Sequence, residues 1–180
     1  MAVHDRSSIV THETSRPART RWLGLALLVA SLAACSTPPA ALRADTLAYL
    51  RKMSSWAPTE AETARTLERI LATEFVDEAE VLRQIADSTP RVQRQLADAE
   101  RYEPRTVDVH RVNASYLGSW RTLLDAYGSI TAGFESGDQT KLSKGRDGMA
   151  RWRDAIVQVA RELRDLRDRT GVDPNDVTPS

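Results

Sequence analysis

Two long stripes of hydrophobic residues dominate the C-terminal half of the chain. Within each stripe the hydrophobic positions recur every three or four residues, which places them on one face of an α-helix. The first stripe comprises Val109, Val112, Tyr116, Trp120, Leu123, Tyr127, Ile130 and Phe134. The second comprises Leu142, Gly145, Met149, Trp152, Ile156, Val159, Leu163 and Leu166. The pattern therefore predicts two long helices, each with one apolar face.

A short polar segment at residues 135–138 separates the two stripes. Gly137 is suited to end the first helix, and Asp138 is suited to cap the second. Because the connection is so short, we expect the two helices to pack antiparallel as a long hairpin. Folding the chain back at this turn brings Trp120 level with Trp152.

One glycine lies within the second stripe, where it is costly. Gly145 lowers helix stability by about 1 kcal/mol relative to alanine. In the hairpin it lies level with Tyr127 and Ile130. We expect it to leave room for the ring of Tyr127.

The part of the chain before the hairpin also has helical periodicity, but it contains several prolines. We expect helices over about 42–55, 59–87 and 90–102, with a break at each proline because proline removes a backbone hydrogen bond. These prolines are Pro58, Pro90 and Pro104. The predicted fold class is all-α: an antiparallel bundle of about four long helices over residues 42–170. Residues 171–180 are expected to form a frayed, disordered tail.

The first 35 residues follow a different pattern, which is typical of a secretory signal. Three arginines precede an apolar run of eleven residues, 22–32, and two alanines then precede Cys35. The arginines are Arg16, Arg19 and Arg21. The apolar run is shorter than the roughly 20 residues that a membrane-spanning helix needs. The pattern therefore predicts a removable signal peptide.

The run Leu32-Ala33-Ala34-Cys35 resembles the lipobox of bacterial lipoprotein precursors. The resemblance implies that residues 1–34 are cleaved and that the sulfur of Cys35 carries diacylglycerol, so that membrane lipid is a partner. Residues 35–41 would then form a short tether. Ser36 at the next position favours the outer membrane in a Gram-negative cell. In a Gram-positive cell the anchor would lie on the outer face of the plasma membrane.

Charge and cysteine content narrow the classes of function. The chain has 25 Lys and Arg and 25 Asp and Glu, and four and two of these precede Ser36, which leaves residues 36–180 with a formal net charge of −2. This balance argues against a nucleic-acid partner, which favours a basic excess. Because Cys35 is the single cysteine, the chain is expected to fold by apolar burial without an internal disulfide.

Candidate catalytic and metal-binding residues are sparse after the proposed cleavage site. His110 is the one histidine there, whereas zinc and di-iron sites need several ligands of this kind. Haem remains an alternative, with His110 and either Met53 or Met149 as axial ligands. We instead expect His110 to be a boundary residue beside the apolar stripe that begins at Val109. The sequence predicts no catalytic residue, cofactor or metal.

These patterns predict a non-enzymatic envelope lipoprotein that acts as a scaffold or protein-interaction module with an envelope protein partner. The first alternative is a carrier of an apolar ligand or haem, with a cavity between helices near Trp120 and Trp152. The second alternative is an enzyme with an unrecognised site. The apolar stripes would also suit oligomerisation through a coiled coil.

Overall fold

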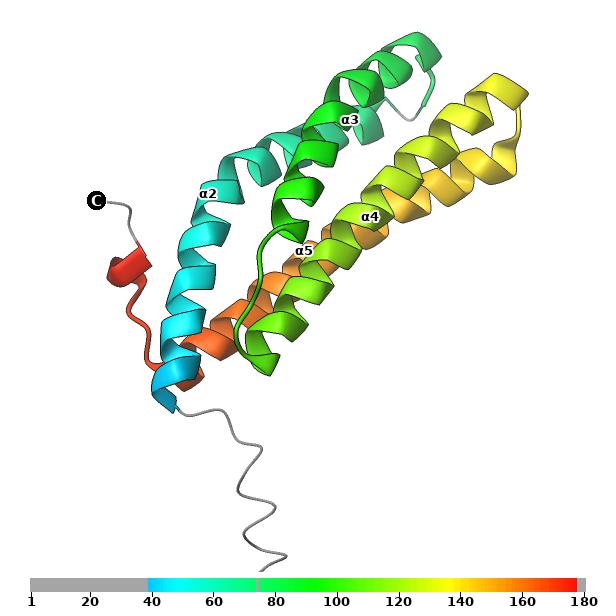
Figure 1. Ribbon diagram of the computed structural model, residues 1–180. Coiled ribbons are helices and arrows are strands. Elements are labelled where there is room, and N and C mark those ends of the chain that lie inside the picture. The colour runs from blue at the N-terminus through cyan, green and yellow to red at the C-terminus, as the bar shows by residue number, and fades with distance from the viewer. Residues whose placement is uncertain (1–38, 74, 178–180) are drawn as a thin grey trace, which may run out of the picture. The chain divides into compact units, whose positions relative to one another are not determined.

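The structure, a computed structural model, describes residues 39–73 and 75–177. These residues form four long α-helices and one short 3-10 helix, and they contain no strand. The helices are α2 (Pro39–Ala72), α3 (Glu78–Glu100), α4 (Val107–Ser136) and α5 (Gln139–Thr170), followed by η2 (Pro174–Val177). Figure 1 shows α4 and α5 side by side, with α2 and α3 packed along them. The predicted all-α helical bundle is confirmed.

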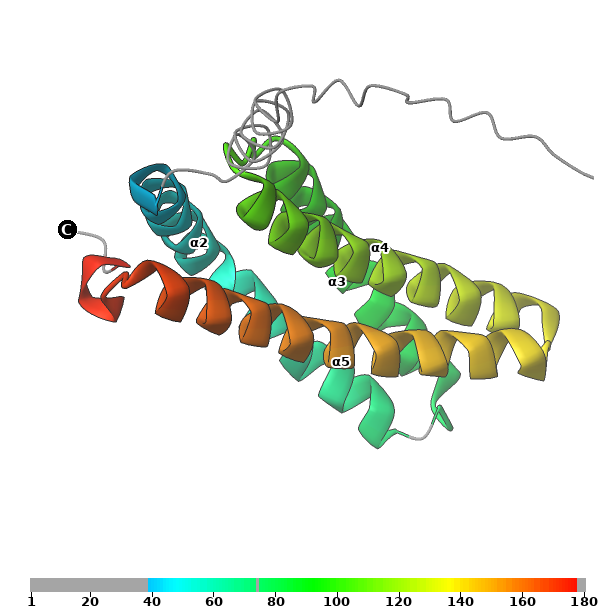
Figure 2. The same ribbon diagram turned by 90° about the horizontal axis from the view of Figure 1, so that it is seen from below.

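The hairpin of α4 and α5 is formed as its turn predicts. Gly137 ends α4 with a φ of 65°, in the left-handed region that glycine adopts without steric cost. Asp138 caps α5, because its carboxylate accepts hydrogen bonds from the backbone N–H groups of Thr140 at 2.9 Å and Lys141 at 3.3 Å. The two helices make the most extensive contact between elements of the domain (Figure 2).

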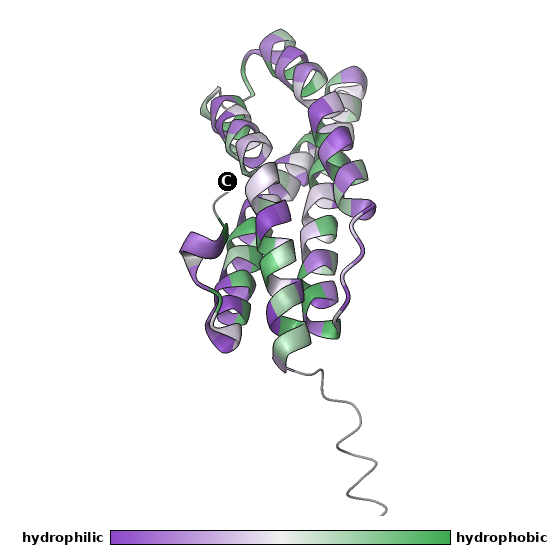
Figure 3. Cartoon of the chain, turned by 60° about the vertical axis from the view of Figure 1, so that its left-hand side comes forward, coloured by the Kyte–Doolittle hydropathy of each residue, from purple (hydrophilic) through white to green (hydrophobic). Residues whose placement is uncertain are grey.

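The two tryptophans meet across the hairpin as expected. The rings of Trp120 and Trp152 lie 5.6 Å apart in an edge-to-face arrangement, and both are buried. Most of both stripes is buried around this pair, and Phe134, Ile156 and Leu163 are partly buried against the core. Figure 3 shows hydrophobic and hydrophilic residues alternating along the helices, as burial of one face requires.

Three glycines allow α4 and α5 to approach closely. A Cβ atom at Gly133 would lie 2.7 Å from Leu142 Cδ2, and one at Gly148 would lie 2.7 Å from the Cβ of Ala126. A Cβ atom at Gly145 would overlap Ile130 and lie 3.0 Å from the carbonyl oxygen of Ala126. The prediction that Gly145 makes room for the ring of Tyr127 is therefore wrong. Gly145 instead makes room for Ile130 and the α4 backbone.

The predicted breaks at Pro58 and Pro90 are wrong. Helix α2 continues through Pro58, and α3 continues through Pro90. Thr59 therefore lies inside α2 and does not start a helix. Figure 1 shows that α2 bends part-way along its length. The predicted break near Pro104 is confirmed, since α3 ends at Glu100 and α4 begins at Val107.

Tertiary packing explains why α2 is not broken at Pro58. A proline in a helix costs about 3 kcal/mol, but the neighbouring Trp56 is buried against three aromatic rings. Its ring stacks on Tyr116 of α4 at 5.2 Å and meets Tyr49 and Tyr102 edge-on at 6.4 Å. Burying a side chain of this size offsets much of the proline's cost.

The chain turns instead between the end of α2 and the start of α3, inside a predicted helix. Phe75 has a φ of 62°, which is uncommon for a residue other than glycine. Its ring packs on Phe134 at 6.2 Å and lies 5.0 Å from the guanidinium of Arg146. Phe75 fits the helical pattern of the sequence, but it lies outside a helix because its ring packs on Phe134 near the hairpin turn. Asp77 then caps α3 by accepting from Glu80 N–H at 3.0 Å.

The predicted frayed tail is ordered up to residue 177. Val172 is buried, and the 3-10 helix η2 follows it. The backbone carbonyl of Asp176 accepts hydrogen bonds from Arg51 of α2 at 2.9 and 3.1 Å. The final turns of the chain therefore pack on α2.

We predict opposite stability effects for alanine at two glycines of the hairpin. Gly145→Ala should destabilise the protein by roughly 1–3 kcal/mol, because its methyl group has no room against α4. Gly118→Ala is the matched control, since a Cβ there meets nothing within 4 Å. It should stabilise the protein by up to about 1 kcal/mol. Thermal unfolding measures both, and a stabilising Gly145→Ala would contradict close helix contact.

Candidate functional site

The predicted lipidation site, Cys35, lies outside the described residues. The described domain begins at Pro39, four residues further along the chain. Four residues span at most about 14 Å. An anchor at Cys35 would therefore hold the domain by the N-terminal end of α2.

The residues considered for haem lie in unlike surroundings. His110 is exposed on the first turn of α4, whereas Met149 is fully buried in the core and Met53 is partly buried. His110 therefore lies beside the buried stripe residue Val109 and is itself exposed. Within residues 39–73 and 75–177, no three His, Cys, Asp or Glu side chains gather in a way that could hold a metal ion.

A buried polar cluster, which the sequence did not predict, surrounds Tyr116. The Tyr116 hydroxyl donates to the Glu60 carboxylate at 2.7 Å and accepts from the Gln95 amide at 2.8 Å. These three residues come from α4, α2 and α3. The cluster thus ties three helices together beside the Trp56 ring.

Burial changes the acidity of this cluster. Desolvation raises the pKa of the Glu60 carboxyl above its usual value near 4.5, and the hydrogen bond from Tyr116 only partly opposes this change. Burial and the nearby Glu60 carboxylate also raise the pKa of the Tyr116 hydroxyl. The arrangement suits a structural hydrogen bond.

A second carboxylate, Asp98, has hydrogen-bonding and charged partners that lower its pKa instead of raising it. Lys52 lies 2.7 Å from it, and the Trp56 indole N–H donates to it at 2.7 Å. These contacts lower the pKa of Asp98 to about 2. Asp98 therefore stays ionised at neutral pH and links α3 to α2.

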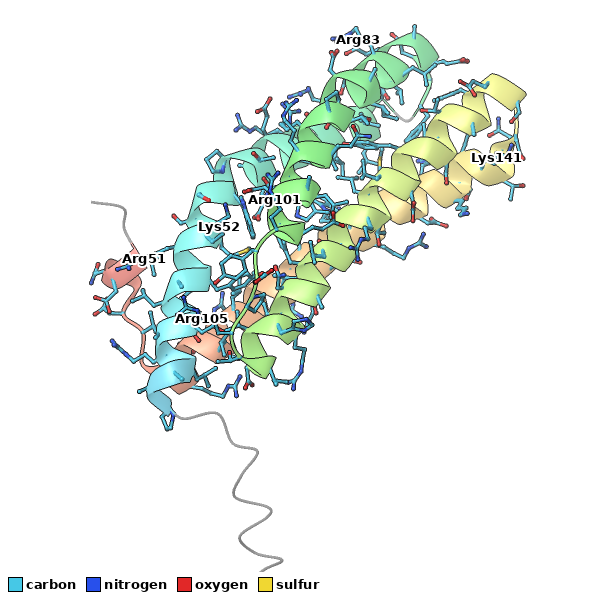
Figure 4. All side chains as sticks on the ribbon, viewed as in Figure 1. Arg51, Lys52, Arg83, Arg101, Arg105 and Lys141 are labelled. Carbon is cyan, nitrogen blue, oxygen red and sulfur yellow. The ribbon has the colours of Figure 1, made fainter. Side chains whose placement is uncertain are left out.

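A groove of about 690 Å³ runs between α4 and α5 on the outer side of the hairpin. We call it the hairpin groove. Small residues line much of it, and three basic side chains of α5 stand along it: Lys141, Lys144 and Arg151. Figure 4 shows Lys141 by the hairpin turn, at the opposite end of the domain from Arg51 and Arg105. Their spacing of three and seven residues is the sequence signal that could have identified them together.

The other grooves differ in chemistry. One lies where Phe75 and Arg146 meet the hairpin turn, and one near Glu162 has mixed charges. A third, between α3 and α4, is mostly apolar and includes Leu82 and Ile85. These three grooves are open to solvent.

Few large hydrophobic residues are exposed in the described part of the chain. They are Val76, Val107 and Val157, which lie on separate elements. Single exposed hydrophobic residues are normal on protein surfaces. Recognition by this domain would therefore depend on its grooves and charges.

Comparisons with known proteins found no match to this chain among protein-family models, curated proteins or solved structures.

We predict that ionisation of the Glu60 carboxyl lowers the stability of the protein as the pH rises. A raised pKa in the folded state stabilises the protein below about pH 4.5, and this contribution is lost as the pH rises through the folded pKa. Glu60→Gln keeps an acceptor for Tyr116 but does not titrate. Relative to the wild type, its free energy of unfolding should therefore increase between pH 4.5 and pH 7.

Urea unfolding followed by tryptophan fluorescence measures this difference. Glu68→Gln, at an exposed position of the same helix, is the control and should show no such trend. If Glu60→Gln changed the free energy of unfolding equally at both pH values, the raised pKa of Glu60 in the folded protein would be refuted.

Proposed function

We propose that this protein is a membrane-anchored bacterial envelope lipoprotein whose helical domain is a non-enzymatic interaction module or scaffold. The observation that carries the proposal is Leu32-Ala33-Ala34-Cys35, which begins at the last residue of an apolar run of signal-peptide length. The single cysteine of the chain stands where lipidation requires it. Ser36 favours the outer membrane if the cell is Gram-negative.

Cys35 precedes the first described helix by four residues in the sequence, which supports an anchoring role. Each buried methylene of an acyl chain contributes roughly 0.8 kcal/mol, and two or more chains hold a protein stably on a bilayer. The short link to Pro39 would keep the domain close to the membrane. Among the described helices, none is both long enough and apolar enough to cross a bilayer.

The surface of the domain supports the interaction role. Its aromatic and apolar residues are used in its own core, and the hairpin groove gathers three basic side chains. Such a domain offers a shaped, charged surface to a protein partner. We infer that the partner binds at a distance from the start of α2, since Lys141 of the groove lies by the hairpin turn, at the other end of the domain.

We predict that Cys35→Ala abolishes lipid attachment. Wild-type protein expressed with an alkyne-tagged palmitate should carry the label and sediment with membranes, because the diacylglycerol on its thiol contains the labelled fatty acid. The variant should lose the label entirely and either retain its signal peptide or appear in the soluble fraction. Labelling followed by membrane fractionation measures both properties.

Ser36→Ala is the matched control, because it changes the adjacent residue and keeps the thiol. It should be labelled like the wild type. If Cys35→Ala were labelled and retained on membranes as strongly as the control, the lipoprotein assignment would be wrong.

A further inference from the structure

The three basic residues of the hairpin groove form a row along one wall. Steps of three and seven residues place Lys141, Lys144 and Arg151 on the same side of α5, over about 15 Å. Lys144 and Arg151 are exposed and form no ion pair with any carboxylate of the described residues. Lys141 is 3.9 Å from Asp138, and its side chain is 46% exposed.

The groove is more basic than the rest of the domain. Asp125 of α4 is the one carboxylate among its lining residues, whereas three basic side chains line it. The mature chain as a whole has slightly more acidic than basic residues. A row of like charges that nearby carboxylates compensate only in part favours an acidic partner.

Small residues keep the groove between the helices open. Gly148 is needed by the fold, because a Cβ there would overlap Ala126. Gly128 is different, since a Cβ there would meet nothing within 4 Å. The packing of the domain does not require this glycine, although it weakens the helix. Close approach of a partner to the α4 backbone would account for it.

The groove lacks the features of a site for a small anion. The hydroxyls of Thr122 and Ser129 donate to backbone carbonyls of their own helix, and the three basic side chains are exposed on the rim. Small anions are held by converging, desolvated donors. A long, shallow channel between two antiparallel helices instead suits a third helix.

We propose that the hairpin groove binds an acidic helix of a protein partner. Carboxylates of that helix lie along Lys141, Lys144 and Arg151, while its small side chains pack over Gly128 and between α4 and α5. This proposal rests on the proposed role as an interaction module. The new proposal adds which surface of this protein binds and which kind of partner segment it binds.

The test is site-specific photo-crosslinking in cells of the source organism that express the full chain. A photoreactive residue replaces Ser129 in the groove. We expect it to capture a protein segment that is helical in pattern and rich in Asp and Glu, which mass spectrometry identifies. In the double variant Lys144→Glu/Arg151→Glu the yield should fall by about tenfold or more, since like charges then face each other.

The matched control is Arg161→Glu/Arg164→Glu, which makes the same charge change at exposed positions of α5 outside the groove. It should leave the yield unchanged, and circular dichroism should show that both double variants are folded. Absence of a crosslink from Ser129, capture of a neutral or basic segment, or equal yields in both double variants would overturn the proposal.

The same experiment separates this proposal from the anchor. An acidic segment captured in a soluble fraction would support the groove and refute the lipoprotein assignment. Membrane-bound protein without a crosslink at Ser129 would refute the groove and leave the anchor intact.

Discussion

The close contact between α4 and α5 is the constraint on which the rest of the domain depends. Gly133, Gly145 and Gly148 let the two backbones approach to distances that a side chain would prevent. Helices this close exclude water from the interface and fix their relative register. That register brings Trp120 against Trp152 and so forms the surface on which the other helices pack.

The positions of helices α2 and α3 depend on their packing against the α4–α5 hairpin. Trp56 packs on Tyr116 of α4, and this contact holds α2 together through Pro58. Phe75 packs on Phe134 near the hairpin turn, which places the connection between α2 and α3 there. Local preferences near Pro58 and Phe75 are overridden because both residues lie next to aromatic contacts with α4. The hairpin therefore organises segments that precede it in the chain.

This dependence explains which features could be predicted from the sequence. The hairpin was predictable because its stripes, Gly137 and Asp138 are local signals that agree with one another. The breaks predicted at Pro58 and Pro90 were wrong, since both helices continue. At Pro58 the packing of Trp56 on Tyr116 outweighs a penalty that acts locally. The Glu60 cluster and the hairpin groove were missed, because each joins residues of different helices. Cys35 stays a prediction, as it lies outside the described residues.

Native-state hydrogen exchange of the backbone amides tests the role of the hairpin most directly. The account predicts that amides of α4 and α5 between Tyr127 and Met149, except those in the turn at 135–139, exchange only through global unfolding. Amides next to Phe75, at the turn between α2 and α3, should exchange through a local opening of lower free energy. The account is contradicted if the hairpin amides exchange as readily as those beside Phe75.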